Sequence, residues 1–156
     1  MALIKLNNQS ISAVSALPSG IDTGKIGQVV QASGNNGLST TSTSFVYANI
    51  GVTITPTATT SKIYVSIGFN NRTSTDQEFI ATIYRDSTNL GDSADGFFRD
   101  QSKVANSKNF VYMQHLDAPS STSAIDYKVF IRGEGQTIVG NADAADWSFI
   151  AMEVLT

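Results

Sequence analysis

The chain has 156 residues, of which 41% are hydrophobic and 15% charged, and its net charge at pH 7 is −3. This length favours one domain with its own core, and the low charge leaves a surface of Ser, Thr, Asn, Gln and Gly side chains. Scattered basic residues argue against nucleic acid as a partner, the absence of cysteine excludes disulfides and thiolate chemistry, and the lack of a long apolar run argues against a membrane span.

The first 25 residues form a leader that carries several apolar side chains and ends near Pro18 and Gly20. These apolar residues are Leu3, Ile4, Leu6, Ile11, Val14 and Leu17. The first three suit a short strand, and the last three would share one face of a brief helix. Neither piece is long enough to be stable alone, so we expect an anchoring arm (1–25) that orders only against a neighbour. The alternative is an extra edge strand that folds back on the head domain (26–156).

Beyond the leader, apolar residues alternate with a period of two, which predicts half-buried β-strands. The clearest case is 61–70, where Ile63, Val65, Ile67 and Phe69 fall on one face. The same pattern predicts strands at 78–84, 109–116, 124–132 and 147–155, with weaker ones at 27–32, 44–50 and 52–56. Turn residues separate these segments. The chain is therefore predicted to be all-β, an antiparallel sandwich of the jelly-roll type.

Several predicted strands carry large apolar residues on both faces. These residues include Ile80, Tyr84, Phe130, Ile150 and Met152. In an isolated antiparallel sandwich, one face of each sheet is solvated and should be polar. We therefore expect a second subunit to cover this face, and the alternative is a scatter of surface aromatics without a role.

Four segments carry a resemblance to a known family. The stretches "IYRDSTNLG", "HLDAPSSTSAIDYKVFIRG" and "SFIAMEV", with an Asn-bearing turn at Asn141, resemble the tumour-necrosis-factor-like jelly-roll heads of bacteriophage virion proteins, especially of marine and cyanobacterial phages. The matching positions are Leu116, Asp117, Pro119, Thr122, Tyr127, Met152 and Glu153, and the leader is also similar to the start of many such proteins. The resemblance implies a homotrimer with aromatic and aliphatic residues along its threefold axis. Tyr127, Phe130, Trp147 and Phe149 are the residues we expect at that interface or in the core beneath it.

Catalytic and metal-binding patterns are nearly absent, so we expect a non-enzymatic protein without cofactors. His115 is the single histidine and lies mid-strand, which favours an edge or interface role over a Ser-His-Asp triad. The acidic clusters Asp92, Asp95, Asp100 and Asn141, Asp143, Asp146 do not have the spacing of a calcium loop. We expect solvated turn carboxylates there, and calcium bound by loop oxygens is the alternative.

These observations favour a structural protein of the virion, assembled in the host cytoplasm. A head decoration (cement) protein needs a short arm along the capsid shell and a compact trimer above it. A receptor-binding tip of a short tail fibre or spike is the alternative, but a fibre needs a shaft, and 25 helical residues span only about 38 Å. The expected partners are further copies of the chain and the major capsid protein, or another virion protein, through the arm. A host surface glycan is a further candidate.

Overall fold

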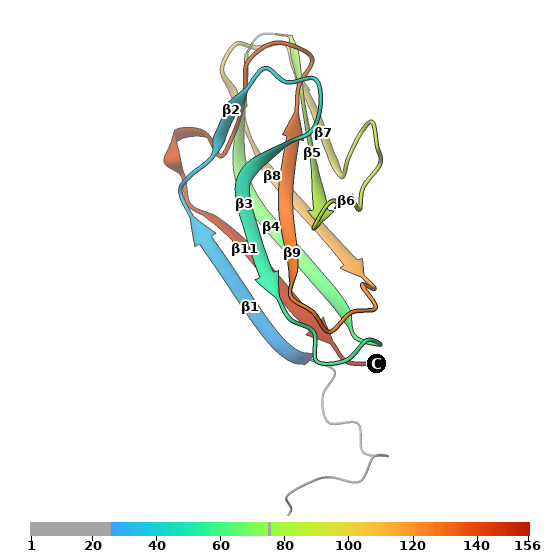
Figure 1. Cartoon of the computed structure of the whole chain (residues 1–156). Coiled ribbons are helices and arrows are strands. Elements are labelled where there is room, and N and C mark those ends of the chain that lie inside the picture. Colours follow the sequence, from blue (N-terminus) through green and yellow to red (C-terminus); the bar gives the residue numbers. More distant parts are fainter. Residues whose placement is uncertain (1–25, 75) are drawn as a thin grey trace, which may run out of the picture.

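A computed structural model describes residues 26–74 and 76–156, which form two antiparallel sheets packed face to face (Figure 1). Sheet A contains β1 (Ile26–Gly34), β11 (Trp147–Val154), β4 (Lys62–Thr73) and β8 (Ser107–Asp117), with the short strands β10 (Ile138–Gly140) and β2 (Leu38–Thr40) beside the end of β4. Sheet B contains β3 (Val46–Ile54), β9 (Ile125–Arg132) and β5 (Gln77–Arg85), with β6 (Thr88–Asn89) and β7 (Phe98–Ser102) paired to β5. A 3₁₀ turn, η1 (Ala142–Ala144), precedes β11.

The pairing of the long strands is nested, which defines a jelly roll. In chain order, the first long strand pairs with the last (β1 with β11), and the second with the second-last (β3 with β9). The two inner pairs are β4 with β8 and β5 with β7. The predicted fold class is confirmed.

The core lies between the two sheets and follows the predicted alternation. On β4 the four residues predicted to share a face, Ile63, Val65, Ile67 and Phe69, are completely buried. Sheet B contributes Val129 and Ile131 of β9 and the inward residues of β5 to the same cluster. Each large side chain buried in this way stabilises the fold by roughly 1.5 to 3 kcal/mol.

Two details of the strand prediction are wrong. The segments 44–50 and 52–56 are not separate strands, because β3 runs through both with a bulge at Asn49, whose φ is 61°. The short or polar strands β2, β6, β7 and β10 lie in segments predicted as turns and loops. Alternation of apolar residues cannot identify strands that carry few of them.

The arm residues Leu3, Ile4, Leu6, Ile11, Val14 and Leu17 lie outside the described residues. Within the described part of the chain there is no helix long and apolar enough to cross a membrane.

Candidate functional site

Asp117 forms a buried polar clasp between the two sheets. It ends β8 of sheet A and accepts two hydrogen bonds from Arg85 of β5, at 2.9 and 3.0 Å. The hydroxyl of Tyr127 on β9 donates to the same carboxylate at 2.7 Å. Burial and the Asp117 carboxylate both raise the pKa of Tyr127, so its hydroxyl keeps the proton that it donates. Two residues of the family-like motif therefore hold the sandwich together at this end.

Glu153, a third motif residue, is completely buried at the end of β11. Its carboxylate accepts hydrogen bonds from the side-chain amide of Gln28 at 2.8 Å and from both the backbone N–H and the hydroxyl of Thr57 at 2.6 and 2.8 Å. Burial alone would raise the pKa of Glu153, but these hydrogen bonds outweigh it and lower the pKa to about 2. The ionised carboxylate thus ties β1 and the β3–β4 loop to β11.

The outer face of sheet A carries an apolar row that crosses four strands. Val29 of β1 pairs with Met152 of β11, Met152 with Tyr64 of β4, and Tyr64 with Leu116 of β8. Residues that are opposite each other in neighbouring strands have their side chains side by side. The row therefore runs from one edge of the sheet to the other.

Exposed hydrophobic side chains gather on the strands of this same sheet. Seven large hydrophobics are exposed among the described residues, and five of them lie on β1 and β8: Ile26 (52%), Val29 (57%), Phe110 (64%), Tyr112 (53%) and Leu116 (50%). The outward positions between Lys62 at one end and Arg72 and Lys108 at the other carry no charge on β4 and β8. A contiguous, uncharged and apolar face of this kind marks an interaction surface.

The tip of the Phe110 ring lies over Gly68 of β4, where the absence of a side chain leaves room for it. A Cβ atom on Gly68 would lie 2.7 Å from the Cζ atom of Phe110, closer than real contacts allow. On the same outer face, polar side chains bond to one another: the Tyr64 hydroxyl donates to Gln114 at 2.6 Å, and the Ser66 hydroxyl donates to Tyr112 at 3.1 Å. The outer face of sheet A thus offers few unpaired polar groups.

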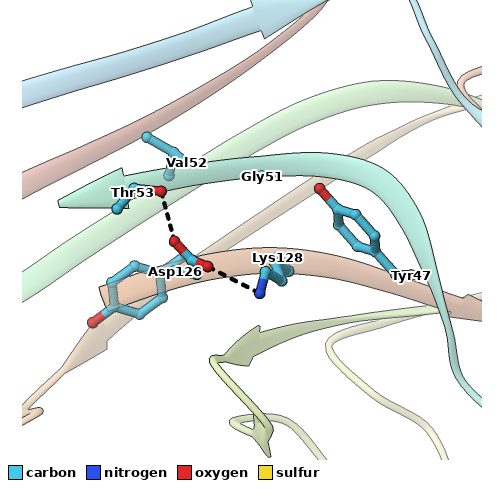
Figure 2. Close-up of a pocket in the computed structure, with 7 residues that line it drawn as sticks. Tyr47, Gly51, Val52, Thr53, Asp126 and Lys128 are labelled. Atoms are coloured by element: carbon cyan, nitrogen blue, oxygen red, sulfur yellow. Dashed lines mark hydrogen bonds and ion pairs between the residues drawn. The ribbon is translucent and has the colours of Figure 1, made fainter. Parts of the chain in front are cut away.

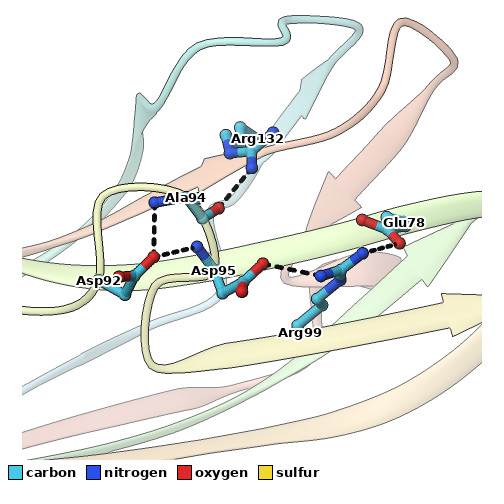
Figure 3. A network of polar contacts seen from close by, with 6 residues as sticks. All are labelled: Glu78, Asp92, Ala94, Asp95, Arg99 and Arg132. Carbon is cyan, nitrogen blue, oxygen red and sulfur yellow. Dashed lines mark hydrogen bonds and ion pairs between the residues drawn. The ribbon is translucent and has the colours of Figure 1, made fainter.

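Around Ile80, the outer face of sheet B is covered by its own chain. Ile80 of β5 is 1% exposed and is flanked in register by Arg132 of β9 and Arg99 of β7. Arg132 donates to the backbone carbonyl of Ala94, and Arg99 bonds to Glu78 and, at 2.8 Å, to Asp95 (Figure 3). Ile80 is thus buried within the single chain, between two long side chains whose apolar stems can cover a neighbour. A second subunit over the rest of this face stays a prediction.

The four residues expected at the trimer interface or in the core fall into two groups. Tyr127, Trp147 and Phe149 lie in the core between the sheets. Phe130 is half-buried on the outer face of sheet B, where its ring stacks on Tyr84 at 4.0 Å. None of the four lies on the outer face of sheet A, and a role along a threefold axis stays a prediction.

The sequence assigned no role to the residues that now define the exposed face. The alternation predicts a strand over 109–116 but gives Phe110, Tyr112 and Leu116 no interface role. The signal was present: large side chains occupy every second position of β8 on the side opposite Val111 and Met113, where a solvated sheet face should be polar.

His115 and the acidic clusters around Asp92 and Asp143 make contacts that are common for a strand histidine and for turn carboxylates. The His115 ring lies 5.2 Å from the ring of Phe97, with no hydrogen-bond partner among the described residues. Asp92 accepts from the backbone N–H groups of Ala94 and Asp95, which lowers the pKa of Asp92. Asp143 forms an ion pair with Lys108, and this contact lowers the pKa of Asp143. In residues 26–74 and 76–156 there is no group of three His, Cys, Asp or Glu residues placed to hold a metal ion.

Comparisons with known proteins find similarity among solved structures. No family model and no curated protein matches the chain. Among solved structures, the chain is similar to the "Structure of infectious bursal disease virus Gx strain", with a TM-score of 0.34 and 17% identical residues. The match covers 83% of this chain but only 37% of the viral chain. Similarity at this level carries no argument about function.

Proposed function

We propose that the chain is a non-enzymatic structural protein of a bacteriophage virion, a trimeric head decoration protein held on the particle by its N-terminal arm. The observation that carries this proposal is the uncharged apolar row on the outer face of sheet A, from Val29 to Leu116. Burying such a row against further copies of the chain removes apolar area from water. Oligomerisation also stabilises a domain that has no disulfides to do so.

The jelly roll by itself does not decide the function, because this architecture carries many unrelated ones. The specific support is the combination of the family-like motif, whose Asp117 and Tyr127 form the buried clasp, with the exposed apolar face of sheet A. The arm residues precede β1, the edge strand that carries Val29. An interface on the sheet whose edge strand follows the arm in the chain suits a trimer that sits on a capsid shell.

A receptor-binding tip of a short tail fibre or spike is the second candidate. The observation that favours it is the aromatic surface of sheet B, where Phe130, Tyr84 and Tyr47 lie in contact across three strands. Such a surface faces away from the proposed interface and remains accessible in the oligomer.

The test compares the full chain with a variant that lacks residues 2–20. We expect both to sediment as homotrimers, and only the full chain to bind particles assembled without this protein. An electron cryo-microscopy map of the reconstituted particles should then show trimers distributed over the head. If the map shows density for this protein at the tail tip alone, the decoration role is wrong and the role as a fibre or spike tip is supported. A monomeric full chain, or unchanged attachment of the shortened chain, would contradict the proposal.

A further inference from the structure

A hollow opens on the outer face of sheet B where β3 bulges away from β9. Tyr47 pairs with Phe130 and Gly51 with Lys128, so three residues of β3 stand opposite one residue of β9. The bulge leaves a hollow of about 190 Å³ (Figure 2). It is lined by Tyr47, Gly51, Val52, Thr53, Asp126, Tyr127 and Lys128.

The polar groups in this hollow are held in place but retain hydrogen-bonding capacity. The Thr53 hydroxyl donates to Oδ1 of Asp126 at 2.6 Å, and Nζ of Lys128 lies 3.0 Å from Oδ2. Both contacts lower the pKa of Asp126, with the Thr53 hydrogen bond as the larger cause. A carboxylate has about four acceptor positions and an ammonium has three donors, so each can bond to a further group. The two charges cancel each other within the hollow.

Aromatic rings lead into the hollow from one side. Tyr47, which is 39% exposed, has its ring 5.8 Å from that of Phe130, and Phe130 stacks on Tyr84 at 4.0 Å. The Tyr47 hydroxyl points toward Gly51, where a Cβ atom would lie only 3.2 Å from it. The glycine thus keeps the hollow open beside the ring.

We propose that the hollow and the adjoining rings bind an uncharged saccharide. A sugar ring has an apolar C–H face that packs on an aromatic ring such as Tyr47, and hydroxyls that both donate and accept hydrogen bonds. The fixed Asp126 and Lys128 pair offers an acceptor and a donor side by side, and its zero net charge favours neither anionic nor cationic ligands. The hollow is smaller than a typical drug-sized site of roughly 300 to 1,000 Å³, so it suits one sugar ring, with the chain continuing over Phe130 and Tyr84.

This inference goes beyond the proposed function and is independent of it, because the hollow belongs to a single chain. It holds whether the protein decorates the head or forms the tip of a fibre. It also holds if the oligomer proposed above does not form.

The test is an NMR titration of the ¹⁵N-labelled full chain with neutral hexasaccharides of glucose, of galactose and of mannose. We expect at least one of them to shift the amide signals of Gly51, Asp126 and Lys128. Asp126→Asn and Tyr47→Ala should each weaken that affinity by about ten-fold. The matched control is Asp143→Asn, which also removes an exposed carboxylate paired with a lysine, but on the other side of the sandwich.

Thermal unfolding of each variant separates lost binding from lost folding. If Tyr47→Ala fails to fold, Asp126→Asn decides, because Asp126 is partly exposed and outside the core. The proposal is overturned if none of the three saccharides shifts these amides, or if the affinity survives in Asp126→Asn. Binding of sulfated or sialylated oligosaccharides alone would also overturn it.

Discussion

The two outer faces of the sandwich have similar sequence patterns but different surroundings. On sheet B, Ile80 lies between two arginines and is buried within the chain, and Phe130 stacks on Tyr84. On sheet A, Val29 and Leu116 end an apolar row that no other segment of the described chain covers. The difference lies in the long cationic side chains, which can cover apolar neighbours while their charged ends reach polar groups.

This contrast indicates which face needs a partner. A sheet face that is covered by its own chain gains nothing from further burial, whereas an exposed apolar face does.

Leu116→Glu should abolish the oligomer. Leu116 ends the apolar row on sheet A, and a carboxylate placed in an apolar interface without a partner costs several kcal/mol. The monomer should still fold, because Leu116 is 50% exposed in the single chain. Sedimentation velocity at micromolar concentration should show trimers for the original chain and monomers for the variant.

The control for this change is Tyr47→Glu on sheet B. It places the same charge at an exposed aromatic position of the other face. We expect it to leave the trimer intact. Dissociation by Tyr47→Glu but not by Leu116→Glu would assign the interface to sheet B.

Asp117→Asn should cost the fold roughly 3 to 5 kcal/mol. It removes the charge that Arg85 and Tyr127 share across the two sheets, and leaves the guanidinium without its counter-charge in a mostly buried setting. Urea denaturation in the Leu116→Glu background would make the measurement unimolecular. Asp126→Asn breaks an exposed pair instead and should cost at most about 1 kcal/mol. If both variants lose the same free energy of unfolding, the buried contacts of Asp117 stabilise the fold no more than an exposed ion pair does.

Acid should weaken the attachment of β1 through Glu153. Its pKa of about 2 lies below the ordinary value of 4.5, so its stabilising effect is complete above pH 4.5 and is lost as the pH falls toward 2. The shift corresponds to about 3 kcal/mol. Urea denaturation from about pH 6 to about pH 2.5 should show a steeper loss in the original chain than in Glu153→Gln. Parallel curves would show that Glu153 contributes no pH dependence.

Much of the fold follows from alternation, whereas the candidate sites depend on register. The inward face of β4 was predictable because Ile63 to Phe69 alternate with smaller or polar residues. The apolar row on sheet A was not predictable, because it is built from four strands: it consists of Val29, Met152, Tyr64 and Leu116. Alternation shows which residues share a face of one strand, but it does not show which strand lies beside it. The hollow on sheet B depends on a bulge at Asn49, which the same apolar pattern does not indicate.

The smallest expected effect comes from Gly68→Ala. The added methyl group would meet the tip of the Phe110 ring at 2.7 Å, and the ring must swing off the outer face of sheet A. Phe110 is 64% exposed and free to move, so the monomer should lose less than about 1 kcal/mol of stability. Trimer association, measured by sedimentation equilibrium, should weaken several-fold because the displaced ring no longer occupies its place on the interface. The double-mutant cycle with Phe110→Ala isolates the cause: in that background Gly68→Ala should have no further effect on association. An equal weakening in both backgrounds would mean that the methyl group acts through the backbone of β4, and Phe110 would then have no place in the interface.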